Sequence, residues 1–273
     1  MPLDEDLIAP SEDLVITSDY TIGESVKRLE VRELQLGLGA RLIIKSPELL
    51  VKAQSISAAS ISTFQYWLAG TVISSSPPPR PAPPPKAANG PAGRRNHPKG
   101  FPGTDGAPGT SGAAGSVGQP AGSLILVVGR ISGLVQIQYS GQQGQPARAG
   151  GDGGEGGDGG PGRTFWGIRS EGGRGGAGGR GGNGGVGGQG GPGGKVTIFH
   201  VEPISENIDP VINGGLGGVK GLGGSGGKGG KGRDRAGRDG LQGLSGSEGS
   251  NGRDGDRGEY KMESIPPEEF KSR

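Results

Sequence analysis

Residues 172–194 read GGRGGAGGRGGNGGVGGQGGPGG, with a side chain at every third position and glycine at the other two. A polyproline II helix has three residues per turn, so this spacing would place all the side chains in one row and leave two faces of bare backbone. Such a helix has no internal hydrogen bonds, and glycine loses more conformational freedom on ordering than any other residue. The segment therefore needs neighbours that pack against its bare faces.

Four other segments also repeat glycine at every third residue. Residues 150–162 and 214–232 carry two glycines per triplet, whereas residues 100–118 and 237–258 carry one, as collagen does. A helix with two bare faces can contact neighbours on two sides, and a helix with one bare face can do so on one side only. We therefore predict a bundle with the three double-glycine segments inside and the two single-glycine segments near its edges, held by backbone hydrogen bonds.

The side-chain rows of these segments predict two further contacts. The acidic row Asp152, Glu155 and Asp158 has the same three-residue period as Arg174 and Arg180, so these charges are expected to pair and to set the register of neighbouring helices. The apolar row of residues 216–222 is expected to face the strand-rich part of the chain.

Short strands at a regular interval are predicted in the N-terminal third of the chain. The apolar triplets form three sets: residues 14–16, 34–36 and 56–58; residues 20–22, 42–44 and 64–66; and residues 29–31, 49–51 and 72–74. Three short strands per repeat, at a period of roughly 20 to 22 residues, indicate three coils of a parallel β-helix. An ordinary antiparallel sheet is the alternative.

The remaining segments complete the predicted organisation. Residues 76–99 are rich in proline, which favours an extended linker or loop; with Arg80, the stretch could also be a ligand for a proline-binding domain. Within the glycine-rich region, strands are expected at 124–139, 163–170 and 195–201. Residues 259–273 are expected to be a polar tail that frays.

The predicted fold class is all-β plus polyproline and polyglycine II structure, with essentially no α-helix. Residues 1–75 form a β-helix-like region, residues 76–99 the linker and residues 100–258 a polyglycine II bundle with interspersed strands.

Composition and charge exclude several classes of protein. Of the 273 residues only 29% are hydrophobic and 4% aromatic, while 64 are glycine, which argues against an ordinary close-packed globular enzyme. The net charge of +2 gives no reason to expect nucleic acid. The sequence has no cysteine, and its longest apolar run, residues 124–128, is too short to span a bilayer. The N-terminus lacks a secretory signal, so we expect no membrane insertion and, at most, surface or virion display by a non-classical route.

Interleaved GGX segments with short apolar connectors resemble the polyglycine II sandwiches of bacteriophage long-tail-fibre adhesins and, more distantly, the glycine-rich antifreeze protein of snow fleas. The resemblance is one of pattern over residues 100–258 and involves no alignable motif. It implies that the connectors at one end of the bundle bind a receptor. The matching connector here is residues 163–171, and the implied ligand-binding residues are Arg163, Phe165, Trp166 and Arg169.

Catalytic, metal and cofactor sites find little support in the sequence. His97 and His200 are the only histidines, and neither has a nucleophile and a carboxylate nearby. Residues 153–158 (GGEGGD) match part of the calcium-binding β-roll repeat, but Gly160 stands where a large apolar residue belongs. The RGG units at Arg174 and Arg180 lack the interleaved aromatic residues of an RNA-binding segment. No catalytic, metal or cofactor residue is predicted.

The leading hypothesis is a non-enzymatic structural or adhesive protein whose loop tips bind a surface glycan or a protein receptor, with homo-oligomerisation open. Aromatic residues beside strands often belong to a core, so a structural role for Phe165 and Trp166 is also open. The alternatives are an ice- or surface-binding protein, a β-helix enzyme acting on polysaccharide and a collagen-like trimeric fibre. Small side chains such as those of Thr104, Thr110 and Ser111 suggest the first of these.

Overall fold

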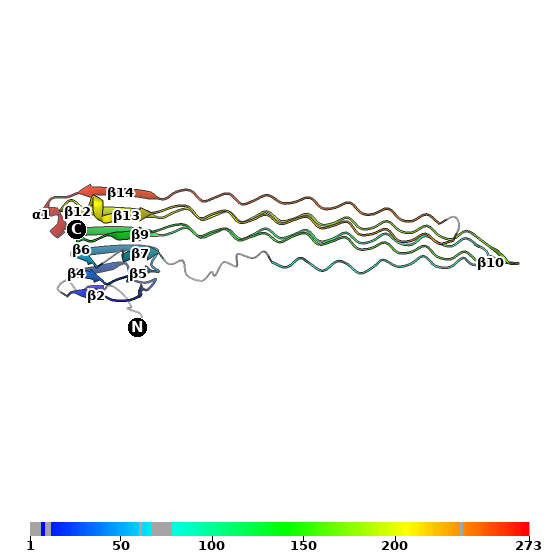
Figure 1. Cartoon of the computed structure of the whole chain (residues 1–273), viewed down its shortest axis with the longest axis horizontal. Helices are drawn as coiled ribbons and strands as arrows, with labels where there is room; N and C mark the ends of the chain where they lie inside the picture. Colours follow the sequence, from blue (N-terminus) through cyan, green and yellow to red (C-terminus); the bar gives the residue numbers. More distant parts are fainter. Residues whose placement is uncertain (1–6, 9–11, 60–61, 67–77, 235–236, 273) are drawn as a thin grey trace.

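The computed structural model describes residues 7–8, 12–59, 62–66, 78–234 and 237–272. Its regular structure is nearly all β-strand, as the sequence predicts, with one short 3₁₀ turn, η1 (Ser205–Asn207), and one six-residue helix, α1 (Pro267–Ser272). The two large sheets lie at one end of an elongated molecule, and the glycine-rich segments run from them to the far end (Figure 1).

Every strand of these two sheets is paired in parallel. The first sheet has the order β1 (Leu7–Ile8), β4 (Arg28–Leu36), β6 (Glu48–Ala58), β8 (Ser123–Ser132), β12 (Lys195–His200) and β14 (Glu259–Ser264), and β2 (Leu14–Ile16) also pairs with β4. The second sheet has the order β13 (Ile208–Val211), β9 (Val135–Gln138), β7 (Ser62–Tyr66), β5 (Arg41–Ile44) and β3 (Tyr20–Ile22). The chain thus alternates between the sheets, adding a strand first to one and then to the other.

The repeat contains two strands, not the three that the sequence predicts. Residues 29–31 and 34–36 belong to one continuous strand, β4, because the intervening Arg32 and Glu33 are not turn-forming residues. The alternation of buried and exposed side chains shifts its phase at this point, and Arg32 is also skipped in the pairing with β6. The strand therefore continues through a local irregularity. The predicted triplet 72–74 lies outside the described residues.

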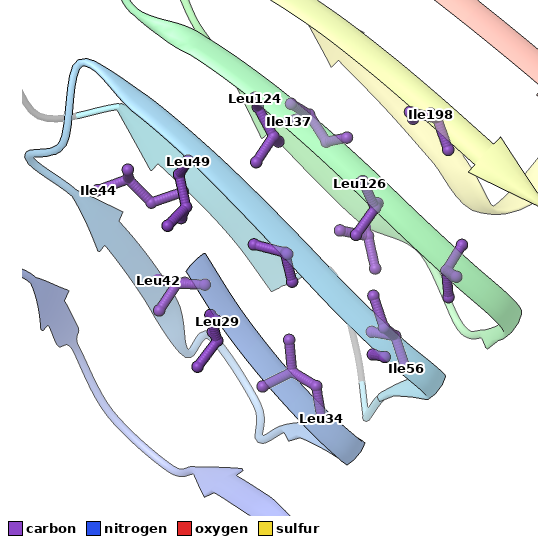
Figure 2. Packing of buried hydrophobic residues seen from close by; sticks show 14 of the residues in the cluster. Leu29, Leu34, Leu42, Ile44, Leu49, Ile56, Leu124, Leu126, Ile137 and Ile198 are labelled. Atoms are coloured by element: carbon purple, nitrogen blue, oxygen red, sulfur yellow. The ribbon is translucent and has the colours of Figure 1, made fainter. Parts of the chain in front are cut away.

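Aliphatic side chains from both sheets form one core between them (Figure 2). Leu29, Val51, Leu126 and Ile198 occupy equivalent positions on successive strands of the first sheet, and all are buried. Ile137 of β9 enters the same core from the second sheet. Because complete burial of such a side chain contributes about 1.5–3 kcal/mol, stacked ladders of this kind supply the hydrophobic stability of the sheets.

Between passes through the sheets the chain makes three long excursions to the far end and back (Figure 1). The outgoing segments 1, 2 and 3 are residues 78–93, 140–162 and 213–233. The returning segments 1, 2 and 3 are residues 100–121, 172–194 and 237–258. We refer to these six segments together as the glycine-rich bundle.

Backbone hydrogen bonds join neighbouring segments of the bundle along their length. In each of the following examples the first residue donates its N–H and the second accepts with its carbonyl oxygen: Gly103 to Arg174 (2.9 Å), Gly175 to Arg238 (2.9 Å), Gly182 to Gly151 (2.8 Å), Gly224 to Gly182 (2.8 Å) and Gly144 to Leu216 (2.9 Å). Returning segment 2 thereby bonds to four others, two returning and two outgoing. The single-glycine segments, returning 1 and returning 3, lie on either side of it.

The glycine faces of returning segment 2 leave no room for a side chain. A Cβ atom on Gly184 would lie 2.0 Å from the carbonyl oxygen of Gly221, and one on Gly185 would lie 2.0 Å from that of Ala113. Both distances are far below van der Waals contact, and the obstructing atoms are backbone atoms. The two bare faces predicted for this segment are therefore both occupied by neighbouring chain.

The proline-rich stretch is a member of the bundle, which corrects its assignment as a linker. The amides of Ala87 and Gly90 donate to carbonyl oxygens of outgoing segment 2 at 2.9 and 2.7 Å. Prolines suit this position because the segment lies at an edge, where few amide donors are needed, and because their backbone is already extended.

The position of this proline-rich segment also explains why the double-glycine pattern of residues 150–162 is short. Cβ atoms on Gly151 and Gly154 would approach Pro81 and Pro84 of outgoing segment 1 to 3.4 and 3.3 Å. Nearer the sheets, the equivalent positions of outgoing segment 2 carry Gln142, Gln145 and Arg148. Two glycines per triplet thus occur where the described part of the proline-rich segment lies alongside.

The acidic row pairs with different partners from those predicted. The carboxylates of Asp152 and Asp158 form ion pairs with Arg80 and with Lys86 (3.0 Å), both on outgoing segment 1. They also accept backbone N–H bonds from outgoing segment 3, for example from Lys231 at 2.9 Å. The prediction of pairing with Arg174 and Arg180 is wrong because the outgoing segments flank the acidic row.

The apolar row of outgoing segment 3 also differs from the prediction. Leu216, Val219 and Leu222 are 64, 59 and 52% exposed and do not face the sheets. The glycines of this segment contact outgoing segment 2 and returning segments 2 and 3, so the side-chain row is left on the outside.

Residues 259–273 were predicted to fray, but much of this stretch is ordered against the sheets. Strand β14 pairs in parallel with β12 from Glu259 to Ser264, and Ile265 is only 4% exposed. The order comes from the edge of β12, which offers unpaired backbone groups to the returning chain.

Candidate functional site

The connector between outgoing and returning segments 2 is a two-stranded antiparallel hairpin at the far end of the bundle (Figure 1). Strand β10 (Thr164–Phe165) pairs with β11 (Ile168–Arg169), and Trp166 and Gly167 form the turn. Their φ angles are 51° and 80°, as a type I′ turn requires. Glycine accommodates this conformation readily, but for a bulky residue such as tryptophan it is strained.

The four residues predicted to bind a ligand lie together on this hairpin. The Trp166 side chain is 95% exposed, and Phe165 and Ile168 beside it are 43 and 75% exposed. The hairpin therefore presents its aromatic residues to solvent, and the alternative in which they belong to a core is wrong.

Contacts with the neighbouring connectors hold the hairpin in place. The Arg163 guanidinium lies 5.2 Å from the centre of the Phe165 ring, which is a cation–π contact. The backbone N–H of Arg163 donates to the carbonyl oxygen of Pro98 at 2.8 Å. Arg169 forms an ion pair of 3.1 Å with Asp234, whose carboxylate also accepts the N–H of Gly162 at 3.0 Å. The tip is thus built from all three connectors.

Sequence reasoning missed the two connectors that flank the hairpin. The first contains Arg94, Arg95, His97 and Lys99, and the His97 ring lies 4.7 Å from that of Phe101. The third begins at Asp234, next to Arg233 at the end of outgoing segment 3. The available signal was the clustering of charged residues between glycine-rich segments of matched spacing.

The other candidate sites considered from the sequence have structural explanations. His200 places its Nδ1 atom 2.9 Å from the carbonyl oxygen of Glu202. In the calcium-like stretch, the Asp158 carboxylate is occupied by the Lys231 amide and the Lys86 ammonium, which hold its pKa below the ordinary value. Among the described residues, no group of three or more histidine, aspartate or glutamate side chains could hold a metal ion.

An open groove of about 660 Å³ lies where the sheets meet the bundle. Its rim carries charged residues of both signs, including Lys27, Glu48, Lys195 and Glu259. Lys195 and Glu259 already form an ion pair of 3.2 Å with each other. The groove therefore shows no concentration of one charge or of reactive groups.

Comparisons with known proteins identify no family for this chain. No family model matches the chain, and no curated protein matches it. Among solved structures, it is 25% identical to a springtail antifreeze protein from Granisotoma rainieri, described as a bundle of nine polyproline type II helices. The match covers 61% of this chain and 93% of that one, with a TM-score of 0.11, too low to support an argument about fold or function. In the part of the chain that the structure describes, no helix is long and apolar enough to cross a membrane.

Proposed function

We propose that this chain is a structural and adhesive protein with three parts. The two sheets are a parallel β-helix that serves as its base, and the glycine-rich segments are a polyglycine II bundle that serves as its shaft. The hairpin of residues 163–169 is the ligand-binding tip. Parallel pairing throughout the sheets and backbone bonds between the segments support the first two assignments.

Dimensions favour the separation of these roles. At roughly 3.1 Å per residue, a segment such as 172–194 in polyproline II conformation would extend about 70 Å from the sheets. A rigid bundle of this length carries its tip well clear of the base. Presentation of the tip from a virion or cell surface fits such a shape.

The single observation that carries the proposal is that Trp166 is exposed and has a positive φ angle. An exposed aromatic side chain of this size lacks the hydrophobic stabilisation that burial would give, and its positive φ adds a strain of about 1–3 kcal/mol. Strained residues cluster at active sites, ligand clamps and switch regions. Trp166 is 95% exposed in a turn that asparagine would fill more easily. The hairpin of β10 and β11 that contains this turn lies at the end of the structure farthest from the sheets (Figure 1).

Binding to an immobilised panel of purified glycans tests the proposal. The wild-type chain should bind at least one glycan class, and Trp166→Ala should weaken that binding about tenfold or more, the amount expected for a principal aromatic contact. Val186→Ala, a change at a half-exposed position on the shaft, serves as the matched control and should bind as the wild type does. Absence of glycan binding, or equal binding by Trp166→Ala, would overturn the proposal.

A further inference from the structure

Positive charge is concentrated at the far end of the molecule, although the chain as a whole is nearly neutral. The described residues of the first two connectors, 94–99 and 163–171, and of the third connector with the adjoining ends of its two segments, 231–239, contain eight lysine and arginine residues and three acidic ones. The basic residues are Arg94, Arg95, Lys99, Arg163, Arg169, Lys231, Arg233 and Arg238, and all are exposed. The whole chain has a net charge of only +2, so the rest of it has a slight excess of negative charge.

The three carboxylates at this end are already engaged. Glu171 pairs with Lys99 at 2.7 Å, and Asp234 pairs with Arg169 at 3.1 Å. Asp239 accepts the backbone N–H of Gly232 at 2.7 Å. Among the described residues, no salt bridge engages Arg94, Arg95, Arg233 or Arg238, although the charge of Arg233 helps to lower the pKa of the Asp158 carboxyl.

These basic residues lie on the aromatic hairpin itself, on the two flanking connectors and on the adjoining segment ends. The first connector touches it through the bond from the Arg163 amide to Pro98, and the third touches it through Asp234. The flanking connectors, which carry Arg94, Arg95 and Asp234, are thus bonded to the base of the hairpin that presents Trp166. The same end of the molecule thus carries positive charge and an exposed flat aromatic surface.

We propose that this end of the molecule binds an acidic polysaccharide, one that carries carboxylate or sulfate groups. This inference rests on the proposed function of the tip and names its ligand class. Trp166 offers a flat face on which one sugar ring can stack, and the arginines offer planar donors that match carboxylate and sulfate oxygens. The favoured contact is one ring on the aromatic turn with its acidic groups directed to the flanking connectors.

The geometry favours a sugar polymer over single-stranded nucleic acid. Proteins that bind single strands line a basic groove with several aromatic residues on which successive bases stack. Here Phe165 and Trp166 belong to one projecting hairpin, whose turn offers Trp166 as a stacking platform for one ring.

The test measures binding of the full chain to four immobilised polymers by surface plasmon resonance. The polymers are polygalacturonic acid, heparin, the neutral polysaccharide dextran and a single-stranded oligothymidylate. Binding to at least one of the two acidic polysaccharides should exceed binding to dextran and to the oligonucleotide. That binding should fall about tenfold or more when sodium chloride is raised from about 0.1 M to about 1 M, because the Debye length shortens from about 10 to about 3 Å.

Two triple variants separate the tip from general basicity. Arg94→Gln, Arg95→Gln and Arg233→Gln should together weaken binding to the acidic polymer about tenfold or more. Arg180→Gln, Lys228→Gln and Arg253→Gln remove the same charge from exposed shaft positions and should weaken it much less. Equal losses in the two variants would overturn the assignment of the acidic ligand to the tip.

The remaining outcomes distinguish this inference from the proposed function. Salt-insensitive binding to dextran that depends on Trp166 would overturn the acidic class and leave the adhesive tip in place. Tighter binding to the oligonucleotide would overturn the acidic polysaccharide in favour of nucleic acid. Binding that Trp166→Ala leaves unchanged, or no binding to any polymer, would overturn both.

Discussion

The sheets and the glycine-rich bundle are packed in opposite ways. In the sheets, large aliphatic side chains such as Leu126 and Ile137 fill the space between two backbone layers. In the bundle the backbones themselves are in contact, and side chains such as Val186 and Leu222 lie outside. The protein therefore has two cores, one made of side chains and one made of peptide groups. Removing a side chain should destabilise the first, and adding a side chain should destabilise the second.

The largest effect is expected from adding a side chain inside the bundle. Gly184→Val should destabilise the bundle by more than about 3 kcal/mol, because even its Cβ atom would lie 2.0 Å from the carbonyl oxygen of Gly221. Thermal unfolding followed by circular dichroism measures the loss. Ala177→Val adds a similar bulk to the side-chain row of the same segment and should cost less than about 1 kcal/mol. Equal effects of the two variants would contradict backbone packing.

Removing a side chain from the sheets should give the next largest effect. Leu126→Ala is expected to cost about 3 kcal/mol, since Leu126 is fully buried and its loss would leave a cavity. The adjacent Ile125, which is 37% exposed, provides the control Ile125→Ala with a smaller cost. Urea denaturation of the three proteins gives the comparison. A cost for Leu126→Ala no greater than that of its control would argue against the side-chain core.

A smaller effect, dependent on pH, is expected at Asp158. The Lys231 amide and Lys86 lower the pKa of this carboxyl, so its contribution to stability is present above the unfolded-state pKa of about 3.9 and is lost as pH falls through the lower folded-state value. At pH 7, Asp158→Ala should cost about 1 kcal/mol. Asp158→Asn keeps an acceptor for the Lys231 amide but has no titrating group.

The free energy of unfolding, measured between about pH 7 and pH 2.5, should therefore fall less steeply for Asp158→Asn than for the wild type. Other carboxylates in both proteins titrate over this range, and the difference between the two curves isolates Asp158. Identical curves would show that the contact with Lys231 and Lys86 contributes nothing to acid sensitivity.

The smallest effect on stability is expected at the tip, where packing plays little part. Trp166→Asn should leave the melting temperature unchanged or slightly higher, because asparagine adopts the left-handed conformation of this turn more readily than tryptophan. The same variant should lose ligand binding. A large fall in melting temperature would mean that Trp166 is a structural residue and not a binding residue.

The sequence predicts the local features of both regions better than it predicts which segments become neighbours. Strand positions such as Leu14–Ile16 and Tyr20–Ile22 are confirmed, because period and apolar content are local properties. The acidic row was assigned the wrong partners because pairing depends on which segments become neighbours. Proline-rich residues 78–93 were assigned to a linker because nothing local shows that their extended backbone lies against residues 150–162.

At the tip, too, the sequence does not predict which segments become neighbours. Its four predicted residues do lie on one hairpin, but they were selected through a resemblance and the position of a connector. The exposure of Trp166, its positive φ and the neighbouring cations of Arg94 and Arg233 depend on how three distant connectors meet. A net charge summed over the whole chain concealed the basic end, because the rest of the sequence offsets it.

Amide hydrogen exchange within residues 172–194, read by NMR, tests the backbone-packed core most directly. The amides of Gly184 and Gly185 donate to Ser247 and Arg148 at 2.8 and 3.0 Å, whereas that of Val186 has no bonded partner among the described residues. Both glycine amides should be strongly protected, and the Val186 amide should exchange much faster. Uniformly fast exchange of all three, at the rate of an unfolded chain, would contradict the account.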